Sequence, residues 1–211
     1  VLRAKEQEQA IFFNGQGGEY LVTLTAINKK NAFVSVNHFE ASDRTPPFKV
    51  ILGQVMSKGD RMDYAIQKAT ELGVGTIQLL TSDRCEMRLK YERDQKKLEH
   101  WQSVAIAACE QCGMNIVPKI LAPLRLEDWF NSNLPATKLV LAPNKDQVDV
   151  LNNVSKDLAL LIGPEGGLSE AEIETANQNH FQSWCIGDRV LRTETAPVVA
   201  LSILNYHFSA K

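Results

Sequence analysis

A short apolar segment followed by a glycine-rich loop and a helical pattern, residues 159–179, constrains this fold more than any other stretch. Ala159–Ile162 has no polar alternation, which is typical of a strand covered on both faces in a parallel sheet. Gly163-Pro164 then makes a turn, and Ser169 with Glu172 forms a capping box that begins a helix. Open α/β sheets bind ligands at the carboxyl ends of their strands, where this loop would lie. The stretch therefore predicts an α/β sheet with a ligand loop, although a tight turn that needs glycine only for its geometry explains it equally well.

A second loop with similar surroundings spans Gly187–Pro197. It follows an expected strand, Gln182–Ile186, and precedes a helix for which Thr195 is a good N-cap. Neither loop has the G-x-x-x-x-G-K-[ST] or G-x-G-x-x-G pattern, so neither standard nucleotide-phosphate cradle is supported. Together the two loops predict one shared pocket, in which Val190-Leu191 could wall a flat group and free main-chain amides could bind its polar edge.

Strand and helix patterns alternate along the chain after Pro47, which predicts a mostly parallel sheet wrapped by helices. The expected strands are Phe48–Val55, Thr76–Leu80, Ile116–Ile120, Lys138–Ala142, Ala159–Ile162 and Gln182–Ile186. The expected helices are Asp60–Leu72, Glu92–Cys112, about Leu126–Phe130, about Asp146–Asn153, Ser169 to about Asn179, and Ala196–Phe208.

The N-terminal part has a different, β-rich pattern. Glu19–Ala26 and Ala32–Phe39 are rich in Val, Thr, Tyr and Phe, and a polar turn, Asn28–Asn31, joins them as a hairpin. We expect a small antiparallel barrel in residues 1–45, separated by a proline-containing break from a second domain, 46–211. Because the sequence opens at Val1 without a capping or turn signal, we expect this first domain to be incomplete.

The composition is that of an ordinary globular protein. The chain has 211 residues, 44% of them hydrophobic, with a formal net charge of −2. This charge argues against indiscriminate coating of nucleic acid but permits a local basic face. No apolar run approaches the roughly 20 residues needed to span a bilayer, and no signal peptide opens the sequence. We therefore expect a cytoplasmic protein with no membrane partner.

The four cysteines and four histidines do not predict a metal site. Cys109 and Cys112 have C-x-x-C spacing, but no second pair exists, and in a helix this spacing only places both on one face. Small buried thiols are the preferred interpretation of all four cysteines.

The motifs of the second domain resemble those of a known family. Leu161–Ser169, with the sequence LIGPEGGLS, precedes Gly187–Ala196, GDRVLRTETA, by about twenty residues. Further matching motifs are Leu52–Val55 (LGQV), Gln67–Val74 (QKATELGV), Ser82–Cys85 (SDRC) and Ala107–Gly113 (AACEQCG). In order and spacing they resemble the bacterial RsmE family, the SPOUT-class methyltransferases that modify uridine N3 in small-subunit ribosomal RNA. The resemblance covers nearly all of the chain after Pro47.

This resemblance implies a SPOUT-type parallel sheet with a deep C-terminal trefoil knot, a PUA-like RNA-binding module in the β-rich N-terminal domain, and a homodimer. It also implies S-adenosylmethionine as the cofactor, whereas the absence of a metal is expected from the cysteine and histidine spacing. The expected cofactor-binding residues are Leu141, Ile162, Gly163, Gly166, Gly167, Ile186, Gly187, Val190, Leu191, Thr195 and Ala196. One departure concerns the segment after Gly113, where Met114–Pro118 replaces a family pattern containing an Arg.

The expected chemistry is methylation of a ring nitrogen that carries a proton. Methyl transfer from a sulfonium is an in-line displacement that depends on positioning. Uracil N3 must lose its proton, so we expect a proton acceptor or a cation that stabilises the developing negative charge. Arg192 is the predicted cation, and Glu194 and then Glu165 are the predicted acceptors. For each glutamate, a favourable charge near a helix N-terminus is an equally good explanation.

RNA contacts are expected from basic residues outside the two loops. Residues 84–97 hold six basic and three acidic side chains, a surplus that can contact phosphates, although a solvated helix start explains it as well. The selected RNA-binding candidates are Arg84, Arg88, Lys90, Lys29 and Lys30.

The sequence thus predicts a methyltransferase acting on N3 of a uridine in the 16S ribosomal RNA of the small subunit. Two alternatives stay open at this point. One is a SPOUT enzyme for another RNA, such as a transfer RNA ribose 2′-O-methyltransferase. The other is a noncatalytic RNA-binding factor in ribosome assembly, which would not bind the cofactor.

Overall fold

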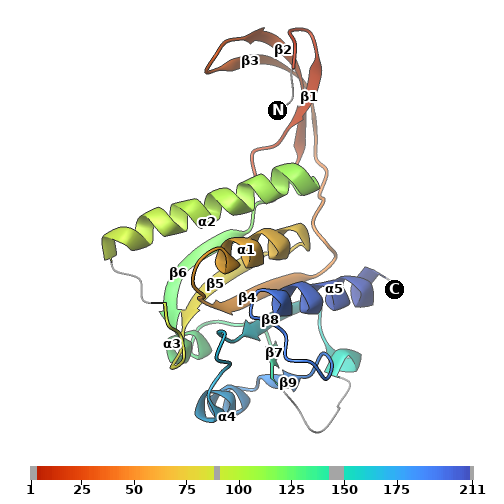
Figure 1. Cartoon of the computed structure of the whole chain (residues 1–211). Helices are drawn as coiled ribbons and strands as arrows, with labels where there is room; N and C mark the ends of the chain where they lie inside the picture. The colour runs from red at the N-terminus through yellow and green to blue at the C-terminus, as the bar shows by residue number, and fades with distance from the viewer. Residues whose placement is uncertain (1–3, 88–90, 143–149, 210–211) are drawn as a thin grey trace.

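The computed structural model describes residues 4–87, 91–142 and 150–209 (Figure 1). The N-terminal part is an antiparallel sheet of β1 (Gln9–Phe12), β2 (Glu19–Ile27) and β3 (Ala32–Glu40), in that order. The predicted hairpin is confirmed, with the Asn28 amide donating to the Asn31 carbonyl across 2.8 Å. The described residues of the expected small antiparallel barrel form a three-stranded sheet. Large apolar side chains on this sheet, among them Ile11, Phe33 and Val36, are exposed.

The second part is built on a six-stranded sheet in the order β6-β5-β4-β8-β7-β9. Every pairing in it is parallel, which confirms the prediction from the alternating pattern. The strands are β4 (Lys49–Val55), β5 (Thr76–Thr81), β6 (Lys119–Arg125), β7 (Thr137–Leu141), β8 (Asp157–Ile162) and β9 (Gln182–Trp184).

Helices cover both faces of this sheet (Figure 1). On one face lie α1 (Arg61–Glu71), α2 (Tyr91–Cys112) and α5 (Thr195–Ser209); on the other lie α3 (Leu126–Phe130) and α4 (Glu170–Gln178). A short 3₁₀ helix, η1 (Val150–Asn153), precedes β8. The strand β8 is buried on both sides: Leu158 and Leu160 face the first layer, whereas Ala159 and Leu161 face the second. This is why residues 158–162 of this strand are continuously apolar.

Two element boundaries differ from the predictions, and for the first the reason is identifiable. The strand β6 begins at Lys119 rather than Ile116, because the preceding residues pair with the N-terminal part. There the Gly17 amide donates to the Asn115 carbonyl, and the Val117 amide donates to the Gly15 carbonyl. Thr195 is the first residue of α5 rather than its N-cap.

Asn115 joins the two parts of the molecule. Its side chain is fully buried, accepts a hydrogen bond from the Arg44 amide at 3.2 Å and donates one to the Ser42 carbonyl at 2.8 Å. Met114 beside it is also buried. The segment that departs from the family pattern therefore packs between the two parts.

The chain after β9 returns across the sheet. From this edge strand it passes the ends of β8 and β4 and enters α5, which packs on α1. The C-terminal knot implied by the family resemblance stays a prediction. Part of the β7–β8 connection, including residues 146–149 of the predicted helical turn, lies outside the described residues. Within the described ranges, no helix combines the length and apolar character needed to cross a bilayer.

Candidate functional site

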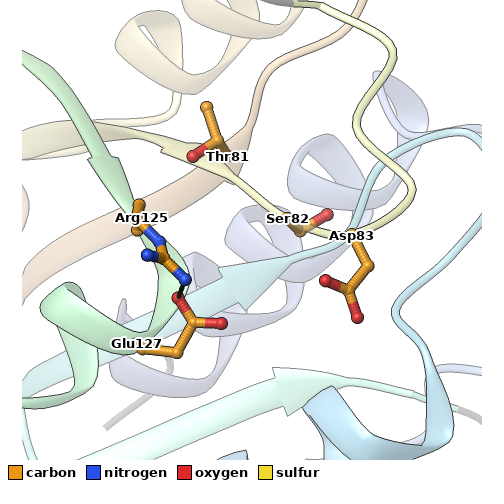
Figure 2. Close-up of a pocket in the computed structure, with 5 residues that line it drawn as sticks. All are labelled: Thr81, Ser82, Asp83, Arg125 and Glu127. Carbon is orange, nitrogen blue, oxygen red and sulfur yellow. Dashed lines mark ion pairs between the residues drawn. The ribbon is translucent and has the colours of Figure 1, made fainter.

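The carboxyl ends of the parallel strands bring several loops to one edge of the sheet. These are segments 56–60 after β4, 82–87 after β5, 163–169 after β8, and 185–194 between β9 and α5. A polar hollow at the ends of β5 and β6 is lined by Thr81, Ser82, Asp83, Arg125 and Glu127 (Figure 2). None of these five is a predicted cofactor residue. The hollow nevertheless adjoins the first of the two predicted cofactor loops, because Ser169 Oγ donates to Asp83 Oδ2 at 3.3 Å.

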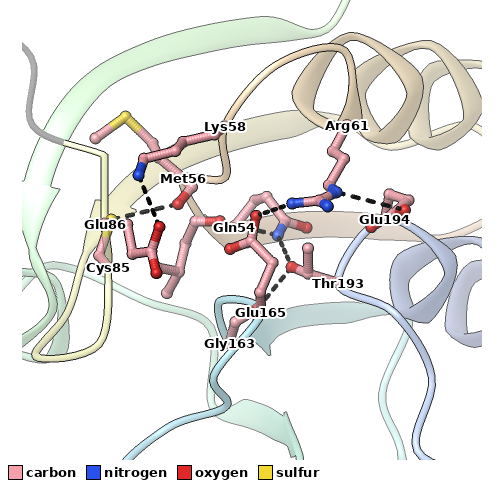
Figure 3. A network of polar contacts seen from close by, with 11 residues as sticks. Gln54, Met56, Lys58, Arg61, Cys85, Glu86, Gly163, Glu165, Thr193 and Glu194 are labelled. Atoms are coloured by element: carbon pink, nitrogen blue, oxygen red, sulfur yellow. Dashed lines mark hydrogen bonds and ion pairs between the residues drawn. The ribbon is translucent and has the colours of Figure 1, made fainter.

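Thr193 connects the two predicted cofactor loops. Its buried hydroxyl donates to the Gly163 carbonyl at 2.7 Å and accepts from Gln54 Nε2 at 3.1 Å (Figure 3). Gln54, which stands near the end of β4, is itself buried. The two loops are thus in direct contact at Gly163, a predicted cofactor residue, through Thr193 and Gln54, which are not among the predicted site residues.

The two predicted proton acceptors lie on either side of one arginine. Arg61, the first residue of α1, places Nη1 2.8 Å from Glu165 Oε1 and Nε 4.0 Å from Glu194 Oε1 (Figure 3). The Glu194 side chain is 15% exposed and that of Glu165 34%, so Glu194 is the more enclosed carboxylate. Arg61 was not among the predicted site residues, because nothing in its local sequence points to either loop.

Three buried side-chain oxygens at this edge, Glu194 Oε2, Gln54 Oε1 and Ser82 Oγ, have no hydrogen-bond partner in the part of the chain that the structure describes. Buried polar atoms of native proteins almost always have a partner. Such atoms therefore mark positions where a bound donor would be stabilised.

Arg192, the predicted cation, is exposed and forms no ion pair with any described residue. Its carbonyl accepts the Thr195 and Ala196 amides, which fixes the backbone at the start of α5. The guanidinium is therefore available to an incoming anionic or carbonyl oxygen.

The loop 163–169 is braced by segment 82–84. Arg84 Nη1 donates to the Gly166 carbonyl at 2.9 Å, and the Asp83 amide donates to Glu172 Oε1 at 2.8 Å. The predicted capping box is confirmed, since Ser169 and Glu172 each accept the other's amide. Glu172 thus holds the helix start and the neighbouring loop together. Arg84 was selected for RNA contact, and the structure shows its guanidinium directed to the loop.

The other RNA-binding candidates are distributed differently. Lys29 and Lys30 are exposed in the turn between β2 and β3. Arg88 and Lys90 lie outside the described residues. RNA binding by these side chains stays a prediction.

The predicted cofactor residues differ in how much of each is exposed to solvent. Ile162 and Ala196 are buried; Leu141, Gly163, Ile186, Leu191 and Thr195 are half-buried; Gly166, Gly167, Gly187 and Val190 are exposed. Val190 is 98% exposed, so it does not wall a pocket within this chain alone. Gly187 has φ +116°, a conformation that favours glycine. None of the main-chain amides of 186–191 donates to a carbonyl of the described residues.

The expectation of four buried thiols is wrong for Cys112, which is exposed; Cys109 is buried, and Cys85 and Cys185 are half-buried. Burial raises the pKa of the Cys109 thiol to about 11. The spacing correctly places Cys109 and Cys112 on one face of a helix, but it does not determine burial. Because α2 is long, only part of that face contacts the core. The described residues contain no group of three metal-ligating side chains.

The fold and its loops correspond to a known class of RNA-modifying enzymes. An RNA methyltransferase domain family matches residues 44–205, and an RNA methyltransferase PUA domain family matches residues 1–37. The matches leave residues 38–43 between them, and the predicted boundary at 45/46 stays a prediction. Together they define an α/β RNA methyltransferase with a PUA-like N-terminal part.

Relatives narrow this class to one family. The ribosomal RNA small subunit methyltransferase E of Buchnera aphidicola subsp. Schizaphis graminum is 34% identical, over 99% of this chain and 85% of the relative. That of Bacillus subtilis is 31% identical, over 98% and 84%. The crystal structure of the Neisseria gonorrhoeae enzyme bound to S-adenosyl methionine has a TM-score of 0.89 at 35% identity, over 96% of this chain and 84% of that one. The chain belongs to the RsmE family.

The residues present fit S-adenosylmethionine. Leu141, Ile186 and Leu191 are partly buried apolar side chains that pack on the core and offer surface to a flat ring. The main-chain amides of residues 186–191, which donate to no carbonyl of the described residues, can donate hydrogen bonds to the polar edge of an adenine.

Proposed function

We propose that this chain is an S-adenosylmethionine-dependent methyltransferase that methylates N3 of a uridine in the 16S ribosomal RNA of the small subunit. The names of its relatives support the small-subunit RNA as substrate. The choice of N3 as the methylated atom rests on Glu194 Oε2, which is buried and has no donor among the described residues. A uracil N3–H is a suitable donor, and it carries the proton that has to leave.

The proposed chemistry assigns separate roles to the charged residues. Glu194 accepts the N3 proton, and Arg192 stabilises the negative charge that develops on the flanking uracil carbonyls. S-adenosylmethionine, when bound, would supply an electrophilic methyl carbon for in-line attack by the deprotonated N3, with the sulfur leaving as the neutral thioether of S-adenosylhomocysteine. Glu165 is not free to accept a proton in the same way, because its carboxylate already contacts Arg61 at 2.8 Å. This contact favours Glu194 over Glu165 as the acceptor.

We further propose that the active form is a homodimer acting in the cytoplasm, with residues 1–45 contributing to RNA binding. The exposure of Val190 on a cofactor loop and of Tyr206 on α5, 98% and 78%, supports contact with a second copy. Light scattering coupled to size exclusion tests the dimer. A monomer that retains full activity would contradict it.

The deciding experiment is transfer of labelled methyl groups to small ribosomal subunits that lack the modification. We expect incorporation into 16S RNA, with N3-methyluridine identified by mass spectrometry of the digested nucleosides. Incorporation only into transfer RNA, or a ribose-methylated product, would contradict the proposed substrate. Absence of S-adenosylhomocysteine binding by calorimetry would instead indicate a noncatalytic RNA-binding factor.

A further inference from the structure

We infer that Arg61 is a positioning residue for the methyl transfer: it holds Glu194 in place across the two cofactor loops, using Glu165 as its anchor. The inference rests on the proposed role of Glu194 as proton acceptor. Its basis is the single guanidinium lying between carboxylates from segments 163–169 and 185–194.

The two contacts of Arg61 are unequal. The Nη1–Glu165 Oε1 distance of 2.8 Å is a charge-assisted hydrogen bond, whereas the Nε–Glu194 Oε1 distance of 4.0 Å is not a hydrogen bond. Glu165 therefore fixes the orientation of the guanidinium. The positive charge of Arg61 attracts Glu194, but the guanidinium donates no hydrogen bond to the Glu194 oxygens.

This arrangement suits a proton acceptor. A carboxylate whose oxygens all accept strong hydrogen bonds is a poor base, because protonation would break those bonds. Glu194 keeps Oε2 buried and without a donor among the described residues, while Arg61 balances its charge from the other oxygen. The cation thus restrains the carboxylate and leaves one oxygen for the substrate.

The planar fork of arginine explains the residue type. Its Nε and Nη donors point in different directions, so one side chain can serve two carboxylates from separate loops. A lysine at this position has one nitrogen and can satisfy only one of them well. Arg61→Lys should therefore restore part of the function that Arg61→Met loses.

Lys58 provides a matched control for charge. It lies at the same edge, is exposed, and pairs with Glu86 at 2.7 Å rather than with a cofactor loop (Figure 3). If Arg61 served only to attract RNA, Lys58→Met would raise KM as much as Arg61→Met does.

The test measures turnover with saturating S-adenosylmethionine and saturating unmodified small subunits. We expect Arg61→Met to lower kcat by on the order of 10- to 100-fold, the scale of a misplaced catalytic group. Its affinity for S-adenosylhomocysteine should change by less than about fivefold, the scale of one exposed ion pair. Arg61→Lys should be intermediate, and Lys58→Met should retain the wild-type kcat. Melting temperatures establish that each variant is folded.

The double variant separates this inference from the proposed function. If Arg61 acts through Glu194, Arg61→Met should cause no further loss in a Glu194→Gln background. A loss of the same size in both backgrounds, or wild-type kcat for Arg61→Met, would overturn the role of Arg61 alone. Wild-type turnover of Glu194→Gln would overturn the proposed proton acceptor itself.

Discussion

The hydroxyl of Thr193 donates to the carbonyl of Gly163 across 2.7 Å and thereby joins the two predicted cofactor loops at residues 30 positions apart in the sequence. The same hydroxyl accepts from buried Gln54 Nε2, a residue 139 positions away. One side chain therefore links the end of β4 to the loop after β8 and to the segment before α5.

Replacing this hydroxyl by a methyl group should destabilise the protein and loosen the cofactor site. Thr193→Val removes the hydroxyl donor to the Gly163 carbonyl and one of the two acceptors of Gln54 Nε2, which keeps the Val55 carbonyl. We expect the unfolding free energy to fall by about 1–3 kcal/mol. Denaturant unfolding measures this loss, and calorimetry with S-adenosylhomocysteine should show weaker binding. The matched control is Thr175→Val in α4, whose hydroxyl bonds only to the Ala171 carbonyl one turn back. A stability change no greater than that of the control would contradict the linking role.

Glu172 should stabilise the protein more than other glutamates of α4. Glu172→Ala removes the acceptor of both the Ser169 and Asp83 amides, which should lower the unfolding free energy by about 1–3 kcal/mol. Glu174→Ala is the comparison, because Glu174 is exposed and contacts only Gln178. Equal melting temperatures for the two variants would show that the bracing contact is unimportant.

Arg192→Ala should lower kcat by on the order of 100-fold with little effect on cofactor affinity, because its guanidinium acts on charge that develops in the transition state. The measurements are single-turnover methylation and S-adenosylhomocysteine binding. Arg189→Ala, on the same exposed loop, is the charge-matched control and should retain the wild-type rate. An unchanged rate for Arg192→Ala at saturating cofactor would remove Arg192 from the mechanism.

The two thiols of the C-x-x-C motif should react at very different rates. Burial raises the pKa of Cys109 from 9.0 to about 11, so at pH 8 almost none of it is thiolate, the reactive form. Exposed Cys112 should be alkylated first by iodoacetamide, as mass spectrometry of peptides would show. In denaturant both should react alike. Equal alkylation in the native protein would contradict the burial of Cys109.

The raised pKa of Cys109 also makes the free energy of unfolding depend on pH. The folded pKa of Cys109 lies above the unfolded value, so the folded state holds this proton more tightly. Its contribution to stability is complete below pH 9 and is lost as pH rises towards 11. A Cys109→Ser variant should lack this part of the alkaline decline.

The sequence by itself determined the order of strands and helices and the parallel sheet, and it predicted the two loops proposed to bind the cofactor. These features depend on local chemistry: apolar runs of strand length, the Ser169–Glu172 capping box, and glycines at the turns. Motif order further identified the family, which the comparisons confirmed.

Only the tertiary structure decided which side chains meet at the site. Arg61 and Glu165 are 104 positions apart, and Arg84 and Gly166 are 82 apart. Hydrogen bonds and ion pairs depend on the distance between atoms in space, and no local periodicity encodes contacts between residues so far apart in the chain. For the same reason the C-x-x-C spacing could not show that Cys109 is buried while Cys112 is exposed.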